Sequence, residues 1–118
     1  MKLVKPSWVF HDGKPIFTID IHPDGSRFAT GGQSMSATPC SGGIICIWSL
    51  EPVRSETDEQ VSAHQDHQDT RDQSSTLKHP RELCRLEQHN ACVNCVRWAH
   101  CGRWLASCSD DRLVMVIL

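Results

Sequence analysis

Short apolar runs separated by polar turns recur along this chain, most clearly near its carboxyl end. The runs at 93–98 and 104–108 flank a polar turn, and a third run, at 113–116, follows a pair of aspartates. Apolar runs of this length, bounded by turn residues, are typical of β-strands. This stretch therefore predicts three short antiparallel strands.

The same spacing appears near the amino end when the sequence is shifted by 77 positions, which carries Ile16 onto Val93. The shift also carries Gly25 onto Gly102 in the first turn of each unit. An internal repeat of strand triplets is typical of repeat architectures, in which no unit buries its apolar face alone. We therefore expect the two units to stack against each other.

The pattern divides the chain into three parts, at 1–50, 51–82 and 83–118. The first part is expected to hold an amino-terminal outer strand over 2–10 and inner strands over 16–21, 27–30 and 44–48, with a flexible loop at 33–43. The polar middle part has few apolar residues and predicts a disordered inserted loop. A strand over 82–86 then closes the first unit, and the last part forms most of a second unit.

Polar residues at fixed places in both units resemble the WD repeat of β-propellers. That repeat has a His before the first strand, a Ser or Thr ending the second, an Asp in the next turn and a Trp closing the third. The second unit has His89, Ser107 and Asp111 in those places, and the first has Thr30 and Trp48. The resemblance implies a buried hydrogen-bond chain with a structural role, in which every polar group needs a partner.

Neither unit contains all four residues of that pattern. Ile117 stands six residues after Asp111, where a Trp is expected, and Gly42 stands where the first unit should have its Asp. His11 also lies one residue further from its strand than His89 does. We expect an all-β fold of the WD type: a β-propeller fragment with about two four-stranded antiparallel blades and an incomplete ring.

Charge and composition exclude several functions. The net charge is -2, and the basic residues are scattered rather than clustered, so no direct DNA contact is predicted. No apolar run is long enough to span a membrane and no secretory signal is visible. We expect a soluble intracellular chain with no membrane partner, no small-molecule substrate and no cofactor.

Seven cysteines, an odd number without a secretory signal, favour reduced thiols that fill strand positions. Cys92 and Cys95, with His89 nearby, have a spacing seen in zinc sites. In a strand, however, residues three apart point to opposite faces unless a bulge intervenes, so no metal site is predicted there. His64 and His67 could bind a transition metal, but a solvated loop is the preferred interpretation.

Several longer stretches resemble the amino-terminal start of the HIRA family of histone chaperones. They are MKLVKPSW at 1–8, HDGKPIF at 11–17, DIHPDG at 20–25, FATGGQ at 28–33 and ACVNCVRW at 91–98. The resemblance covers 1–33 and about 83–116 and begins at Met1. It agrees in whole stretches, which goes beyond the generic WD pattern.

This resemblance implies a nuclear chromatin regulator whose propeller belongs to a complex that deposits histone H3.3 with histone H4 independently of DNA replication. It also implies roles in nucleosome assembly and in transcription regulation, often repression, and contact with a ubinuclein-type subunit. No partner-binding residue can be carried over, because the matching stretches belong to the scaffold. The chain would then be a truncated form of such a propeller, and we expect it to fold poorly alone.

Two alternatives come from other classes of protein. The chain could be a generic WD-repeat scaffold of another complex, which the partners it co-purifies with would reveal. It could also be a hydrolase or metal enzyme, but no nucleophile, base and orienting group recur at a meaningful spacing. We therefore predict that the chain is not an enzyme.

Overall fold

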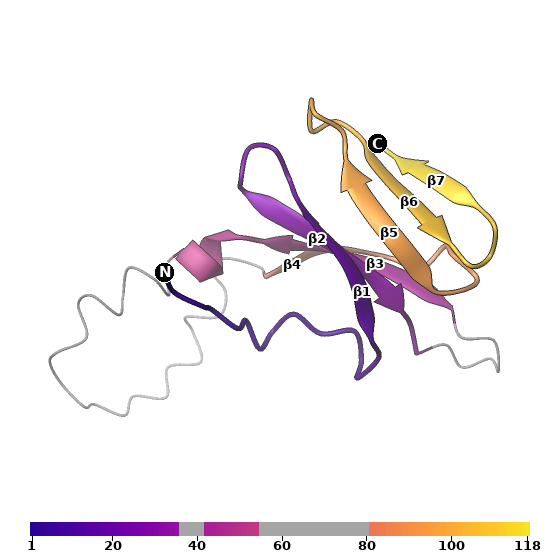
Figure 1. Ribbon diagram of the computed structural model, residues 1–118, viewed down its shortest axis with the longest axis horizontal. Coiled ribbons are helices and arrows are strands. Elements are labelled where there is room, and N and C mark those ends of the chain that lie inside the picture. The colour runs from indigo at the N-terminus through magenta and orange to yellow at the C-terminus, as the bar shows by residue number, and fades with distance from the viewer. Residues whose placement is uncertain (36–41, 55–80) are drawn as a thin grey trace, which may run out of the picture.

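Seven strands in two antiparallel sheets form the core of the computed structural model, which describes residues 1–35, 42–54 and 81–118 (Figure 1). The first sheet contains β1 (Ile16–Ile21), β2 (Arg27–Gln33), β3 (Gly43–Ser49) and β4 (Glu82–Leu86). The second contains β5 (Val93–Trp98), β6 (Leu105–Ser109) and β7 (Val114–Ile117). In both sheets the strands pair in sequence order, so the expected all-β class is confirmed.

The second strand is longer than its sequence pattern indicates. It was predicted to end at Thr30, yet β2 continues to Gln33 because Gly31 and Gly32 pair with Ile45 and Ile44 of β3. A bulky side chain would not fit here, since a Cβ on Gly31 would lie 2.7 Å from a methyl carbon of Val93. The glycines therefore let the second sheet approach this strand closely.

Equivalent tight turns connect the first two strands of each unit. Gly25 has φ 72° and Gly102 has φ 73°, a conformation that glycine adopts without steric cost. The Gly25 amide donates to the His22 carbonyl at 2.8 Å, and the Gly102 amide donates to the Ala99 carbonyl at 2.9 Å. The two turns predicted from the sequence repeat are thus formed in the same way.

A β-bulge interrupts the first strand of each unit, between Ile16 and Thr18 and again between Val93 and Cys95. A bulge adds one residue to a strand, so residues three apart can face the same side. Val93 and Val96 are both fully buried for this reason. Because β5 contains the bulge that strand alternation had to exclude, alternation alone does not place Cys92 and Cys95 on opposite faces.

The segment before β1 forms no strand, which corrects the outer strand predicted over 2–10. Pro6 has no amide hydrogen to give to a ladder, and its carbonyl accepts a turn hydrogen bond from the Val9 amide. Trp8 instead lies on the first sheet, with its ring centroid 5.9 Å from that of Trp48 and 6.2 Å from that of Phe28.

The predicted 51–82 loop begins differently from the prediction, because residues 51–54 form a single helical turn in which the Arg54 amide donates to the Leu50 carbonyl. Glu82 is the first residue of β4, in agreement with the strand predicted over 82–86. The remainder of that loop, at 55–80, lies outside the described residues, as do residues 36–41. In the described segments, no helix is long and apolar enough to cross a membrane.

Two hydrophobic clusters lie on opposite faces of the first sheet, because alternate residues of a strand point to opposite sides. The inter-sheet cluster joins both sheets and contains Ala29, Ile45, Val93, Val96 and Leu105, with Ile47, Leu86, Trp98 and Ile117 at its edge. The outer-face cluster contains Phe28, Ile44, Cys46 and Trp48, covered by Trp8, Val9 and Leu50. Among the described residues, the second sheet packs against a partner on one face only.

Candidate functional site: two buried hydrogen-bond networks and a sheet interface

Three of the predicted site residues form one network in the second unit. The His89 ring bonds the Asp111 carboxylate through Nδ1 and the Ser107 hydroxyl through Nε2, each at 2.8 Å. Asp111 also accepts from the Asn90 amide at 3.0 Å and the Leu113 amide at 2.9 Å. The network therefore ties the segment before β5 to β6 and to the turn before β7.

The partners determine which atoms donate. An ionised carboxylate only accepts, so in a neutral imidazole Nδ1 carries the hydrogen and Nε2 accepts from the Ser107 hydroxyl. Burial raises the pKa of Asp111, but the hydrogen bonds from His89, Leu113 and Asn90 outweigh it and hold that pKa at about 2. The carboxylate therefore stays charged at neutral pH.

The first unit contains the matching network with a different member missing. The Trp48 indole donates to the Thr30 hydroxyl at 2.8 Å, and Thr30 bonds His11 Nε2 at 2.8 Å. His11 Nδ1 is buried with no hydrogen-bond partner among the described residues. Burial, followed by the positive charge of Arg85, lowers the pKa of His11. This histidine is kept neutral, and Gly42 supplies no carboxylate to it.

His11 was not among the predicted site residues. Its spacing from the strand differs by one residue from that of His89, so an alignment by fixed distances passes over it. The sequence could still have identified it, because His11 is the only His that precedes the first predicted strand. The structure nevertheless brings it to Thr30, with His11 Nε2 2.8 Å from the Thr30 hydroxyl.

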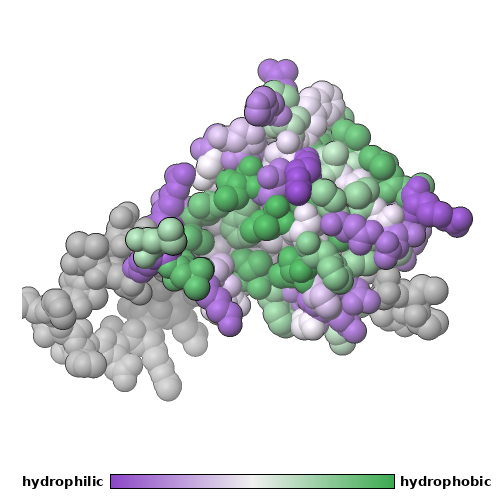
Figure 2. Space-filling model, in the orientation of Figure 1, coloured by the Kyte–Doolittle hydropathy of each residue, from purple (hydrophilic) through white to green (hydrophobic). Residues whose placement is uncertain are grey.

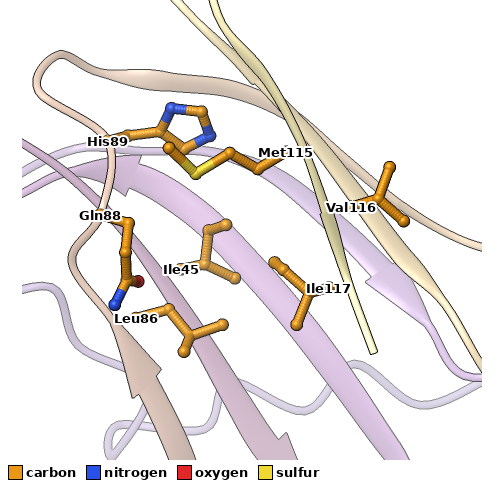
Figure 3. Close-up of a pocket in the computed structure, with 7 residues that line it drawn as sticks. All are labelled: Ile45, Leu86, Gln88, His89, Met115, Val116 and Ile117. Atoms are coloured by element: carbon orange, nitrogen blue, oxygen red, sulfur yellow. The ribbon is translucent and has the colours of Figure 1, made fainter.

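Ile117 occupies the place of the missing indole in the second unit. It pairs with Leu105 as Trp48 pairs with Phe28 in the first unit, and the shift of 77 positions carries Phe28 onto Leu105. An open pocket of about 400 Å³ lies beside it, between the sheets (Figure 3). The pocket is lined by Ile45, Leu86, Gln88, His89, Met115, Val116 and Ile117. Mostly apolar side chains form its wall, so it offers little for catalysis.

Hydrogen bonds join the two sheets as well as apolar contacts. The Val96 amide donates to the Thr18 hydroxyl at 3.2 Å, and the Trp98 amide donates to the Asp20 carboxylate at 2.7 Å. The His22 ring adds a bond through Nε2 to the Gly102 carbonyl at 2.9 Å. These bonds fix the position of β5 along β1, so the sheets pack in one register.

The Ser107–His89–Asp111 arrangement has the atom order of a hydrolase triad but not its accessibility. Ser107 and His89 are each only 3% exposed, whereas a nucleophile must reach a substrate carbonyl. Their hydrogen bonds link three segments of one sheet, and of the three residues only His89 lines the open pocket, while Ser107 does not. The arrangement therefore fits a structural tie and not a catalytic centre.

Metal-binding groups are not assembled in the part of the chain that the structure describes, where no three His, Cys, Asp or Glu residues come together. Cys92 directly precedes β5 and Cys95 lies at its bulge, and both are half-buried free thiols. Burial raises the pKa of Cys46 to about 12, so this thiol is unreactive at neutral pH. His64 and His67 fall outside the described residues.

Comparison with known proteins agrees with this geometry. The family model for the WD domain, G-beta repeat, matches residues 4–49 and 80–117, which include every strand of both sheets. A crystal structure of Sqt1 from Chaetomium thermophilum superposes with a TM-score of 0.50 at 15% identity, covering 89% of this chain and 24% of that one. The class is therefore a WD-repeat β-propeller, represented here by two antiparallel sheets of an incomplete ring.

The sequence relatives narrow the class further. Protein HIRA of Mus musculus is 47% identical over 98% of this chain, and Protein HIRA homolog of Drosophila melanogaster is 44% identical over 98% of it. The chain belongs to the WD-repeat family and, within it, to the HIRA proteins. It spans about a tenth of the length of these relatives, covering 10% of the mouse protein and 9% of the fly protein.

Proposed function

We propose that this chain contributes two blades to a propeller that docks partner proteins in a nuclear histone-chaperone complex. The complex would assemble nucleosomes independently of DNA replication by depositing histone H3.3 with histone H4. It would also act in transcription regulation, and a ubinuclein-type subunit would contact the propeller. The observation that carries the proposal is 47% identity to HIRA over 98% of the chain.

The polar networks have a supporting role in this proposal. His89, Ser107 and Asp111 would tie the second blade together, and Thr30 and Trp48 would do the same in the first. Because four of these residues are buried and the Asp111 side chain is only 6% exposed, they are available to the fold and not to a substrate or partner. Partner binding would then fall to exposed residues of a rigid scaffold, as is usual for repeat proteins.

The three parts of the chain, at 1–50, 51–82 and 83–118, would each have a place in the proposed propeller. Residues 1–50 would supply the covering segment and three strands of the first blade, and 83–118 would supply its outer strand and most of the second. The segment at 51–82 would be an insertion between the third and fourth strands of the first blade. A propeller tolerates long insertions at such connections, because they lie at the surface.

Immunoprecipitation from cross-linked nuclei tests the proposal. An antibody raised against a peptide from 55–80 would capture the endogenous protein, and mass spectrometry would identify what co-purifies. We expect a ubinuclein-type subunit with histones H3.3 and H4, and their loss when the antibody is blocked with the free peptide. Recovery of a different set of partners, without histones, would instead identify a scaffold of another assembly.

A further inference from the structure

The imidazole ring of His22 bridges the two sheets at the turns that connect their first two strands. His22 directly follows β1, and its Nε2 lies 2.9 Å from the carbonyl oxygen of Gly102, in the turn between β5 and β6. Figure 2 shows hydrophilic residues at the top of the molecule, the end where Figure 1 places the β5–β6 turn. The bridge therefore lies at a polar end of the sheet interface, where the ring can exchange protons with solvent.

Packing holds the ring in this position. The His22 and Trp98 rings meet edge to face, with their centroids 4.7 Å apart and their planes at 75°. A Cβ on Gly102 would lie 2.5 Å from His22 Nε2, so the β5–β6 turn packs directly on the ring only because residue 102 has no side chain. Each ring nitrogen therefore keeps the same neighbours whichever hydrogens it carries.

Both ring nitrogens face oxygen acceptors. Nδ1 lies 2.7 Å from a carboxylate oxygen of Asp24, while Nε2 faces the Gly102 carbonyl. A neutral imidazole has one N–H group, and only the imidazolium ion has two. A neutral ring therefore leaves one nitrogen lone pair against an oxygen, whereas the protonated ring donates to both acceptors.

The Asp24 carboxylate is the stronger of the two acceptors. Hydrogen bonds from Ser26, followed by the bond from His22, hold the pKa of Asp24 at about 2, so it is charged at neutral pH. Hydrogen bonds to a charged group are about twice as strong as neutral ones. The Asp24 amide, 3.2 Å from Nδ1, donates to it only when the lone pair of Nδ1 also faces the carboxylate. A neutral ring is therefore expected to keep its hydrogen on Nδ1 and to lose the bond to Gly102.

We propose that His22 is a pH-dependent tie between the two blades, which bonds the β5–β6 turn when the ring is protonated and releases it when the ring is neutral. Histidine is the side chain whose charge ordinarily changes between pH 5 and 8. The tie is complete at the lower end of this range and is lost as the pH rises through it. The bonds from the Val96 and Trp98 amides to β1 involve neither ring nitrogen, so the sheets stay packed while the two turns loosen.

Other ionisable groups lie on the segments around the ring. Asp20 of β1 accepts from the Trp98 amide, and Arg54 of the helical turn donates to the Gly25 carbonyl. The ionisable side chains of these segments, besides Asp24, are those of Asp20, Arg27, Glu51, Arg54, Arg97, His100, Cys101 and Arg103. Among them His100 is the only other histidine, so the experiment has to separate its titration from that of His22.

Nitrogen NMR of the unchanged chain shows which ring nitrogen carries hydrogen. At pH 8 we expect His22 to carry it on Nδ1 alone, at pH 5 on both nitrogens, and the Gly102 carbonyl signal to shift with the ring. His100→Gln, in the same turn as Gly102, is the control and should leave that shift in place. A neutral ring with its hydrogen on Nε2 would overturn the proposal, because the bond to Gly102 would then exist at both pH values. So would a ring whose protonation does not change between them.

Two variants test the tie itself. Asp24→Ala removes the competing carboxylate at a side chain that is 54% exposed, so the neutral ring should move its hydrogen to Nε2 and keep the bond to Gly102 at pH 8. His22→Gln leaves an uncharged donor in place of the ring and should remove the pH dependence.

Urea unfolding measures the effect of the tie on stability. The ratio of the unfolding equilibrium constant of the unchanged chain to that of His22→Gln should be about threefold lower at pH 5 than at pH 8, the size expected of a partly exposed ion pair. His100 is present in both proteins and cancels from the ratio. Equal ratios at the two pH values would rule the proposal out.

Discussion

Ser107 and Thr30 hold the same place in the two units, each as the hydroxyl between a buried histidine and the rest of its network. A buried polar group that loses its partner costs more than the hydrogen bond itself contributed. Removing either hydroxyl is therefore expected to lower the free energy of unfolding, because the buried groups that it bonds would be left without a partner.

Ser107→Ala should lower the free energy of unfolding by about 1 kcal/mol, because His89 Nε2 loses its hydroxyl partner in a buried site. Ser107→Thr is the matched control, since threonine stands at the equivalent place in the first unit and keeps the hydroxyl. Urea unfolding at one fixed protein concentration measures both. An alanine variant as stable as the unchanged chain would show that the network does not support the fold.

Gly42→Asp should raise the free energy of unfolding by about 1 kcal/mol, because it places a carboxylate where the first unit lacks one. The acceptor would be available to His11 Nδ1, which is buried and without a partner in the described residues. Gly42→Asn, which has the same size without the charge, separates the charged from the neutral contribution. If the Gly42→Asp variant is less stable than both the unchanged chain and the Gly42→Asn variant, the carboxylate does not reach His11.

Acid should destabilise the chain through Asp111. Its folded pKa is about 2, below the usual value of 3.8, so the unfolded state takes up a proton first as the pH falls. The contribution is therefore present above about pH 4 and lost as the pH approaches 2. The stability difference from Asp111→Asn should shrink across that window. Asp24, whose pKa is also about 2, is present in both proteins and cancels from the difference.

At the scale of elements, the hydrophobic pattern predicted which segments become strands but not how each is shaped. Both bulges escaped detection because a bulge changes the face of a side chain without changing its residue type. The extension of β2 was missed because glycine is uncommon in strands, and here it is retained for the close approach of Val93. The amino-terminal segment has strand-like residues but packs as an irregular cover.

Trp8→Ala should therefore destabilise the first sheet, since this ring covers Phe28 and Trp48 in the outer-face cluster. We expect a loss of about 2 kcal/mol, below the 3–5 kcal/mol typical of a fully buried tryptophan, because Trp8 is only half-buried. Leu3→Ala, at a side chain that is 95% exposed, is the control in the same segment. Equal unfolding midpoints for the two variants would show that the segment does not cover the sheet.

At the scale of the whole molecule, the sequence repeat predicted two units, and the structure shows how they meet. The WD pattern identified His89, Ser107 and Asp111 because their spacing in sequence is regular. It could not reveal the bonds from β5 to Thr18 and Asp20, since a hydroxyl and a carboxylate on a strand are common. The amides that donate to them, those of Val96 and Trp98, lie 78 residues further along the chain. Contacts between units depend on packing, which no local pattern encodes.

Amide hydrogen exchange at Val96 and Trp98, followed by NMR, tests most directly whether the two sheets are packed blades of one propeller. These two amides donate to side chains of the first sheet, so protection of both reports the interface itself. We expect both to exchange slowly, with Thr18→Val releasing Val96 alone and Asp20→Ala releasing Trp98 alone. Fast exchange at both positions in a chain whose other strand amides are protected would show that the sheets fold separately, contrary to the structure.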